Sequence, residues 1–318
     1  MKNKIIILIP YFGSFPPWIN LYFESCAFNT HIDWCFFTDC EIPRHKAANL
    51  IFHKTSFSDY CQMVSGKLQI NFSPDNPYKL CGLKPFYGYI HKDLLEGYDF
   101  WGFGDVDVIW GDINQFYTSD ILMKYDVLST HADRLSGHLA LIRNNEKYRK
   151  LCFFIKDWKQ KLESPLAMAL DEQDFSWLVY PQAKFITWFY GKIVRKLFNW
   201  RDAWVLYYFF IMPIFNKLMC AKKRGLYFIE QHTTPILAND ALTFKHDTDK
   251  WLYHNGKIIN TKTNLEHIYF HFMIYKKNGF REDYFWKEKY YNLPYNLSYE
   301  DKILIDKRGF VILDRKNK

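Results

Sequence analysis

The segment from Tyr98 to Ile113 constrains this chain more than any other stretch. An apolar, aromatic run ends at Asp105-Val-Asp107, and a second apolar run begins at once. Side chains two residues apart at a strand end point the same way, because strands alternate faces. Two carboxylates held together in an apolar setting repel and are costly to desolvate. The pattern predicts a hard cation between them, Mg²⁺ or Mn²⁺, which usually binds through one or two carboxylates plus substrate phosphates.

An isolated Asp-x-Asp is more often a solvated turn, so the flanks decide the interpretation. The sequences on both sides of the pair are too apolar for an exposed turn. Gly102, Gly104 and Gly111 lie in these flanks, and we expect them to allow the backbone to approach a ligand closely.

Length and composition bound the class of protein. A chain of 318 residues forms one large domain or two modest ones, and 49% hydrophobic residues suffice for a substantial core. The apolar run before Pro10 is too short for a signal-peptide core and predicts a buried first strand. The cysteines are odd in number, seven, and include no Cys-x-x-Cys pair, which argues against a zinc site or a disulfide framework and for a reducing cytosol.

The net charge of +8 is concentrated in one segment. Between Lys184 and Arg224 there are nine Lys or Arg, twelve aromatic residues and one acid, Asp202. The longest uncharged apolar stretch there, Ala203–Phe215, has 13 residues and contains Pro213, so it is too short to span a bilayer. Basic ends with aromatic residues between them predict a helix pair lying in an anionic membrane interface. A dimer interface and a buried core hairpin are the alternatives.

The first forty residues predict the start of an α/β nucleotide-binding sheet. Ile5–Ile9 has the pattern of a buried parallel strand, Trp18–Asn29 has helical spacing, and Ile32–Asp39 is a second strand. Ligands of such sheets bind at the carboxyl ends of the strands. Three polar positions fall at such ends: Tyr11 to Gly13, Thr38-Asp39, and Asp105 with Asp107.

The rest of the chain continues this alternation. We predict strands at 49–52, 126–130 and 138–143, helices at 56–70 and 145–162, and a basic loop with a helix at 78–97. Two hairpins are expected at 251–259, with Asn255-Gly256 at the turn, and at 303–313. Residues 187–220 are helix-prone, and 264–277 form a strand or helix that carries His267 and His271.

Several stretches, in the same order along most of the chain, match the motifs of one protein family. The chain resembles bacterial GT-A-type (DXD) glycosyltransferases of capsule, lipopolysaccharide and other surface-polysaccharide synthesis. The matching pieces are Ile9-Pro-Tyr-Phe-Gly13, Phe36-Phe-Thr-Asp39, Tyr78-Lys-Leu-Cys-Gly-Leu-Lys-Pro85, Gly102-Phe-Gly-Asp-Val-Asp107, Ser136-Gly-His-Leu139, Asp171-Glu-Gln-Asp174 and His271-Phe272. One departure is Gly82, where the family usually has Asp, so an acidic role at that position is in doubt.

The resemblance implies a GT-A (Rossmann-like) mixed α/β sheet with flanking helices. The aromatic, basic helical insertion at Lys184–Arg224 has no counterpart in the resembled family and is expected from the sequence of this chain. The expected division is a nucleotide-sugar-binding core at 1–183, the insertion at 184–224, and a C-terminal part at 225–318 that completes the metal and acceptor site.

The resemblance also assigns metal ligands. Asp107 is the first choice for direct ligation, Asp105 bridges metal and ribose, and His271 is the implied third ligand. Without the resemblance, a histidine in an apolar run is more often a satisfied core residue. His267 is the weaker candidate.

Further roles follow for residues around the expected donor. Lys84 neutralises leaving-group charge, and Asp171 or Glu172 contacts sugar hydroxyls or acts as the base of an inverting reaction. The nucleobase, ribose and sugar are framed by Tyr11, Gly13, Asp39, Ser136, Gly137 and His138. The ordinary alternatives are a surface lysine, a strand-end turn and a helix cap.

The resulting hypothesis is a cytoplasmic glycosyltransferase, peripheral on the inner face of the plasma membrane. It transfers a sugar from a nucleotide diphosphate donor, with UDP as the expected nucleotide, to a glycan or lipid-linked acceptor, and it needs Mn²⁺ or Mg²⁺. Nucleic acid is not an expected partner, and a homo-oligomer is left open. The alternatives are a non-catalytic membrane-interface protein on the same scaffold and a metal-dependent nucleotidyl or phosphoryl transferase.

Overall fold

The computed structural model describes most of the chain outside one long segment. The described residues are 3–42, 47–131, 134–166, 168, 170–180, 250–272, 275, 293–294 and 296–315, with 188, 192–193, 195–197, 206 and 225–228 between them. The predicted first strand, first helix and second strand are confirmed as β1 (Ile5–Pro10), α1 (Ile19–Phe28) and β2 (Ile32–Thr38).

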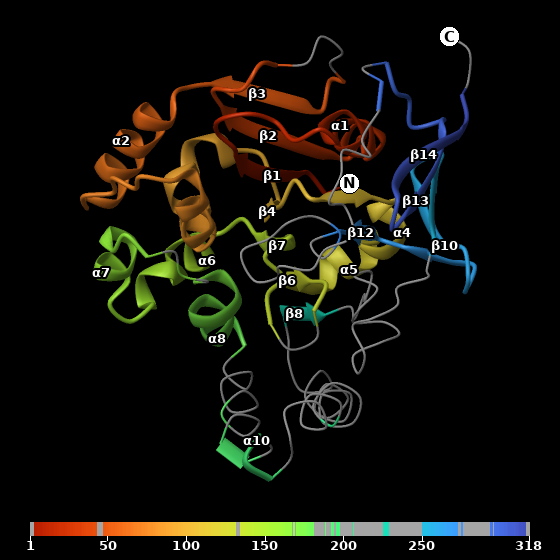
Figure 1. Cartoon of the computed structure of the whole chain (residues 1–318). Helices are drawn as coiled ribbons and strands as arrows, with labels where there is room; N and C mark the ends of the chain where they lie inside the picture. Colours follow the sequence, from red (N-terminus) through yellow and green to blue (C-terminus); the bar gives the residue numbers. More distant parts are fainter. Residues whose placement is uncertain are drawn as a thin grey trace.

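A mixed sheet forms the centre of the molecule (Figure 1). Its order is β3-β2-β1-β4-β7-β6-β8, with β1 to β4 parallel and β7 antiparallel to both β4 and β6. The added strands are β3 (Leu50–Lys54), β4 (Phe100–Gly104), β6 (Tyr125–Ser129), β7 (Leu139–Arg143) and β8 (Gly225–Phe228). The predicted mixed α/β class with flanking helices is confirmed.

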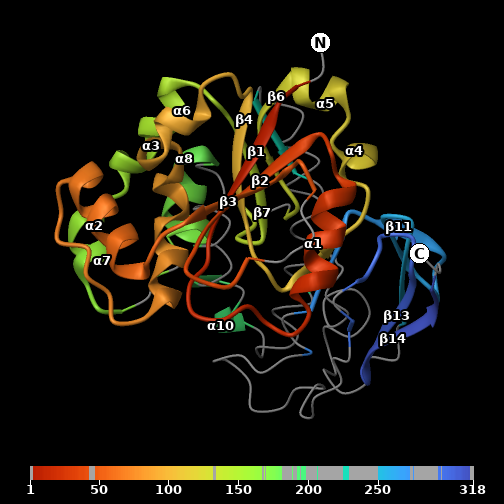
Figure 2. The same cartoon turned by 90° about the horizontal axis from the view of Figure 1, so that it is seen from above.

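Side-chain alternation in β1 explains why both faces of the sheet are covered. Ile5, Ile7 and Ile9 belong to one buried cluster, while Ile6 and Leu8 belong to another. One side of the sheet carries α2 (Phe57–Leu68), α3 (Tyr87–Ile90), α6 (Glu146–Lys150), α7 (Trp158–Glu163) and α8 (Ser176–Val179). Figure 2 shows them across the sheet from α1 and the C-terminal strands.

The C-terminal strands confirm both predicted hairpins. β9 (Trp251–His254) and β10 (Lys257–Asn260) meet at Asn255 and Gly256, whose φ angles of 50° and 66° fit a two-residue hairpin turn. β13 (Lys302–Asp306) and β14 (Gly309–Asp314) form the second, and β11 (Leu265–His267) completes a sheet of order β11-β10-β9-β13-β14.

A separate two-stranded ladder joins distant parts of the chain. β5 (Val108–Trp110), just after the acidic pair, runs antiparallel to β12 (Tyr269–His271). Short helices α4 (Ile113–Phe116), α5 (Ser119–Lys124) and α10 (Arg195–Leu197) complete the described elements apart from the turns given below. The C-terminal histidine is thereby brought to the end of β4.

The predicted continuous helix at 145–162 is wrong, because tertiary packing breaks it. After α6 the chain tightens into a 3₁₀ turn, Leu151–Phe154, and reverses at Asp157, whose φ is +55°. The break lets Phe153 and Trp158 pack on each other and on Phe86, with ring centroids 5.2 to 6.2 Å apart. Burial of these rings outweighs the helix propensity of the intervening residues.

The segment at 78–97, predicted as a basic loop with a helix, is helical for most of its length. Its turns are η1 (Pro77–Phe86), α3 and η2 (Lys92–Leu95), and Asn76 caps the first of them. Pro85 has no N–H to donate, and it is accommodated within η1, which is a 3₁₀ segment. This turn matters because it carries Lys84 into the molecule.

Most of the predicted basic and aromatic insertion, and both of its boundaries with the flanking parts, lie outside the described residues. Among the residues that are described, no helix is both long and apolar enough to cross a membrane.

Candidate metal centre

Three predicted ligands come together at the carboxyl end of β4. Asp105, Asp107 and His271 each present a ligand atom, and these atoms all lie within 4.8 Å of one another. His271 Nε2 lies 3.5 Å from Asp107 Oδ1. His271 is buried and the two carboxylates are partly exposed, so one side of the group is open to a ligand.

Backbone contacts hold this acidic turn in place. The indole Nε1–H of Trp18 donates to the carbonyl of Val106 at 2.8 Å, and the Phe272 N–H donates to the carbonyl of Asp107 at 3.1 Å. The β5–β12 register places His271 opposite Val108. Hydrogen bonds within the protein thus join the turn to the strand that carries the histidine, before any ion binds.

The group fits a divalent cation in size and chemistry. An octahedral ion with ligands at about 2.1 Å needs its ligand atoms roughly 3 to 4 Å apart, so small side-chain shifts suffice here. Two carboxylate oxygens suit Mn²⁺ or Mg²⁺, and an imidazole nitrogen is a ligand of transition-metal ions, so the set as a whole favours Mn²⁺.

Lys84 lies buried against this centre rather than on the surface. Its ammonium donates to Asp105 Oδ1 at 2.6 Å and to the carbonyl of Gly137 at 2.8 Å, and it lies 3.7 Å from Asp171 Oδ2. Burial opposes its charge, but the carboxylate of Asp105 and the groups around it raise the pKa of Lys84 well above its usual value. Lys84 therefore stays charged and screens Asp105.

Asp171 and Glu172 approach the same point from the π-helical turn η4 (Asp171–Phe175). Asp171 is buried, and burial raises its pKa to about 6, even though Lys84 acts in the opposite direction. Glu172 accepts from the Gly137 N–H at 3.2 Å and lies 3.6 Å from the guanidinium of Arg134. Two carboxyl groups and an ammonium therefore converge on Gly137.

Polar side chains pack closely around Gly137. A Cβ placed there would lie 3.0 Å from Asp171 Oδ2, 3.2 Å from Glu172 Oε1 and 3.5 Å from Lys84 Nζ, so a larger residue does not fit. Asp171 and Glu172 are hydrogen-bonding partners for hydroxyls, and they lie beside the group of metal ligands.

The residues expected to frame the nucleobase cluster at the ends of β1 and β2. The Gly13 N–H donates to Asp39 Oδ1 at 2.7 Å, and the φ of Gly13 is +98°, which side chains rarely adopt. Burial raises the pKa of Tyr11, and Cys40 and Asp107 add to this, so the phenol lies within electrostatic range of the acidic turn. These two strand ends and the metal centre share one edge of the sheet.

Ser136 and His138 are buried, whereas residues that line a sugar-binding site would be exposed to the ligand. The Ser136 hydroxyl accepts from the Leu139 N–H at 3.4 Å. The ring of His138 packs 4.4 Å from the ring of His271. Burial, together with the imidazoles of His271 and His131, holds the pKa of His138 well below its usual value.

The predicted reason for the flanking glycines is wrong. A Cβ at Gly102 would lie 2.4 Å from the carbonyl of Ala140, and one at Gly111 would lie 2.4 Å from that of His267. These positions admit neighbouring backbone, not a ligand. At Gly82 a Cβ would lie 3.3 Å from the Met168 carbonyl, which leaves little room for the carboxylate usual in the resembled family.

His267 is not part of the group of metal ligands. Its ring packs 5.0 Å from that of Trp251 in the C-terminal sheet. The sequence did not indicate that Trp18 contacts the acidic turn, or that Thr130 and Tyr269 lie behind His271. The period-2 alternation of a strand, which places Tyr269 on the same face as His271, could have indicated the last of these.

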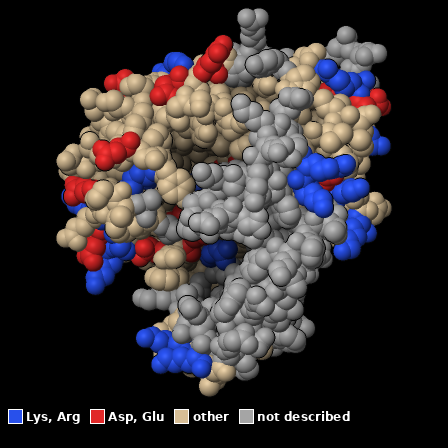
Figure 3. All heavy atoms as spheres, in the orientation of Figure 1, with Lys and Arg blue, Asp and Glu red and all other residues tan. Residues whose placement is uncertain are grey.

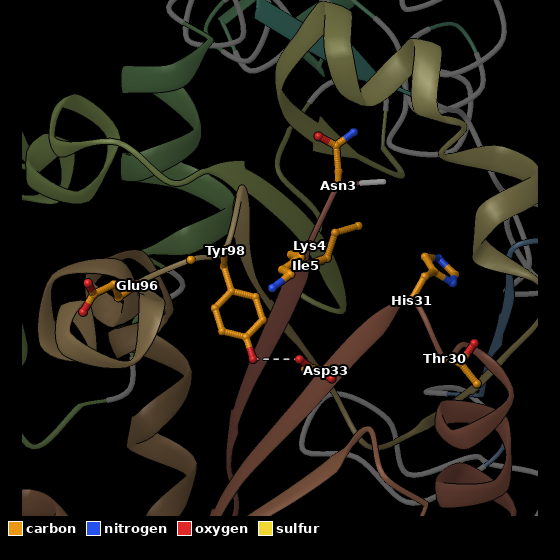
Figure 4. Close-up of a pocket in the computed structure, with 9 residues that line it drawn as sticks. Asn3, Lys4, Ile5, Thr30, His31, Asp33, Glu96 and Tyr98 are labelled. Carbon is orange, nitrogen blue, oxygen red and sulfur yellow. Dashed lines mark hydrogen bonds between the residues drawn. The ribbon is translucent and has the colours of Figure 1, made fainter. Parts of the chain in front are cut away.

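A pocket lies at the amino ends of β1 and β2, at the edge of the sheet opposite to the metal ligands (Figure 4). It has a volume of about 480 Å³ and is lined by Asn3, Lys4, Ile5, Thr30, His31, Asp33, Glu96, Gly97 and Tyr98. Its clearest contact is the Tyr98 hydroxyl donating to Asp33 Oδ2 at 2.7 Å. Parallel sheets bind ligands at their carboxyl ends, so the edge that carries the acidic turn is the better candidate site.

The fold and the site define a mixed α/β protein with a candidate divalent-cation centre at the carboxyl edge of its central sheet. The chain belongs to the family described as "Family of unknown function (DUF6625)", whose model matches residues 7–301.

No curated protein sequence matches the chain significantly. Among solved structures it is similar to the apo-form glycosyltransferase GlyE of Streptococcus pneumoniae TIGR4, with 13% identity and a TM-score of 0.31 over 61% of this chain and 50% of that one. A second structure of the glycosyltransferase GlyE matches with 13% identity and a TM-score of 0.28 over 62% and 50%. The chain thus spans half the length of these structures.

Proposed function

We propose that this protein is a metal-dependent glycosyltransferase that uses a nucleotide diphosphate sugar, with UDP as the nucleotide. The observation that carries the proposal is the group of Asp105, Asp107 and His271 at the carboxyl edge of the sheet, with the Lys84 ammonium 2.6 Å from Asp105. This arrangement suits a diphosphate, because a hard cation and a buried ammonium together offset its charge.

Each group has a defined task in this proposal. A cation held by Asp105, Asp107 and His271 supplies Lewis-acid stabilisation of the leaving diphosphate. Lys84, fixed by the Gly137 carbonyl, places a second positive charge beside the same oxygens. The Gly13 N–H and Asp39 at the ends of β1 and β2 accommodate the nucleoside.

The two acids beside Gly137 suit the hydroxyls of a neutral sugar. Asp171 lies 3.7 Å from the Lys84 ammonium and Glu172 is partly exposed, so carboxyl groups that accept hydrogen bonds from hydroxyls stand next to the metal ligands. A sugar that bears its own carboxylate would face these two acids at short range and be repelled. The donors we propose are therefore UDP-hexoses rather than UDP-uronates.

Calorimetric titration with UDP, in the presence and absence of Mn²⁺, tests the donor site. We expect binding that requires the metal, because the acidic turn alone repels the diphosphate. Binding that is indifferent to Mn²⁺, or no binding at all, would contradict the proposal. Binding to anionic vesicles without any nucleotide binding would favour the alternative of a non-catalytic membrane-interface protein.

The products of slow donor hydrolysis separate this function from its nearest catalytic rival. A glycosyltransferase releases free sugar and UDP, because the bond to the anomeric carbon breaks. A metal-dependent nucleotidyl transferase cleaves the diphosphate and releases sugar phosphate and UMP. Chromatography of the products after incubation with UDP-glucose, UDP-galactose and their N-acetylated forms distinguishes the two.

The pH dependence of donor hydrolysis reports on Asp171. Its carboxyl, with a pKa near 6, loses its proton as the pH rises through that value and then accepts hydroxyl hydrogen bonds. We expect kcat/KM to rise through about pH 6 in the wild type. This rise with pH should disappear in Asp171→Asn. It should persist in the control Asp174→Asn, because the Asp174 carboxylate of the wild type pairs with Lys161 at 2.9 Å and not with Lys84. Identical profiles for all three proteins would exclude the role of Asp171.

We also propose that the insertion places the enzyme on an anionic membrane that carries its lipid-linked acceptor. Five described side chains there are exposed: Trp188, Lys192, Ile193, Lys196 and Leu197. Basic atoms appear at the edge of the surface where α10 lies in Figure 1 (Figure 3). Amphipathic aromatic and aliphatic side chains beside lysines match an interface that is apolar below and anionic above.

Sedimentation with vesicles tests the membrane proposal. We expect binding to phosphatidylglycerol vesicles but not to phosphatidylcholine vesicles. Reversing two charges in Lys192→Glu/Lys196→Glu should weaken it at least tenfold, since each basic residue contributes about 1 kcal/mol near such a surface. The control Lys92→Glu/Lys147→Glu reverses the same charge elsewhere. If the wild type binds no vesicles but forms a dimer in sedimentation velocity, and Lys192→Glu/Lys196→Glu is a monomer, the segment belongs to a dimer interface instead.

A further inference from the structure

We propose that His138 is a positioning residue for the metal ligand His271, and that a hydroxyl chain from Tyr269 through Thr130 holds it. The inference rests on the proposed metal site and adds residues that do not touch the ion or the donor. The observations behind it are the packing of the His138 ring and the hydrogen bonds that link Tyr269, Thr130 and His138.

The His138 ring lies between two side chains of one strand. Tyr269 and His271 are two residues apart on β12, so they project to the same side. The His138 ring centroid is 4.7 Å from that of Tyr269 and 4.4 Å from that of His271. His138 is 4% exposed, so it fills space behind the ligand rather than facing the open side of the centre.

Two hydroxyls fix the far side of this ring. The Tyr269 hydroxyl donates to Thr130 Oγ1 at 3.2 Å, and Thr130 Oγ1 lies 3.3 Å from His138 Nε2. A threonine oxygen can accept from Tyr269 and still either donate to or accept from a ring nitrogen. The contact between Thr130 and His138 Nε2 therefore forms with either neutral tautomer of His138. Together the two hydroxyls hold the plane of the ring.

The contact joins elements far apart in the sequence. Thr130 follows β6 and His138 precedes β7, whereas His271 belongs to the ladder with β5. The His138 ring thus links the central sheet to the strand that carries the third ligand. A metal-binding histidine whose ring is already oriented loses less side-chain entropy on binding, which raises affinity.

Mn²⁺ affinity, measured from the electron paramagnetic resonance of free Mn²⁺, tests the inference. Tyr269→Phe removes one hydroxyl and keeps the ring, while His138→Phe keeps ring volume and removes the hydrogen bond. We expect the Kd for Mn²⁺ to rise about threefold to tenfold in Tyr269→Phe and about tenfold to a hundredfold in His138→Phe, the range for groups that orient metal ligands. His138→Gln keeps an acceptor for Thr130 and should recover part of the loss.

Tyr253→Phe is the matched control, since Tyr253 is an equally buried tyrosine of the C-terminal sheet, packed away from the metal ligands. Its Kd should equal that of the wild type. The inference is overturned if Tyr269→Phe and His138→Phe bind Mn²⁺ like the wild type, or if Tyr253→Phe weakens binding as much as they do. A wild type that binds no Mn²⁺ contradicts the proposed function itself, so the two failures are distinguishable. Urea midpoints of all variants show whether any loss comes from unfolding.

Discussion

Replacing Asp107 with Asn is expected to abolish metal-dependent donor binding. The substitution keeps the size of the side chain but removes one negative charge from the group of metal ligands, Asp105, Asp107 and His271. Losing a direct ligand should cost more than the tenfold to hundredfold effect of losing a supporting partner, so we expect Mn²⁺ affinity to fall about a thousandfold. Donor hydrolysis should fall in parallel, because the diphosphate then lacks its counter-charge.

The matched control for this prediction is Asp120→Asn, the same change at an exposed acid in α5. Calorimetry with Mn²⁺, with and without UDP, should show the control binding like the wild type. Retention of wild-type metal affinity by Asp107→Asn would remove Asp107 from the site and would leave the acidic turn without the role proposed for it.

Replacing Lys84 with Met is expected to impair both stability and catalysis. The ammonium is buried between Asp105 and Asp171, at 2.6 and 3.7 Å, so its removal leaves carboxyl groups without their counter-charge. We expect a loss of about 3 kcal/mol in the free energy of unfolding, the low end for breaking a buried ion pair, because Asp105 is partly exposed. Donor hydrolysis should fall roughly a hundredfold to a thousandfold, as for other preorganised charges.

Lys67→Met provides the comparison, since Lys67 pairs with Asp93 at 2.7 Å on the surface. An exposed pair contributes less than about 1 kcal/mol, so the urea midpoint of this variant should barely change. If Lys84→Met unfolds at the wild-type midpoint, the buried network does not support the fold. If it also keeps full hydrolysis, Lys84 has no part in the leaving-group chemistry.

Local patterns were sufficient for most of the secondary structure. The continuous apolar run of β1, the Asn255-Gly256 turn and the helical pattern at 56–70 are each encoded over a short range, and the elements they predict are present. The helix predicted at 145–162 failed, because the packing of Phe153 and Trp158 on Phe86 depends on a partner almost seventy residues away.

The candidate site was predictable in its residue types but not in its connections. Asp105 and Asp107 could be paired from spacing alone, since two residues apart means one side of a strand end. The role expected for His271 depended on resemblance to a family, because a histidine in an apolar run is by itself more often a core residue. The role of His138 behind His271, rather than beside a sugar, required the three-dimensional packing.

The sequence by itself determined the strands, the turns and the acidic pair, because these depend on backbone geometry and hydrophobic alternation over short range. Tertiary structure alone decided that Lys84 is buried, that Gly102 and Gly111 admit neighbouring strands, and that β12 brings His271 to Asp107. Contacts of this kind join residues 21 to 164 positions apart. They follow from how sheets and helices pack, which no local pattern records.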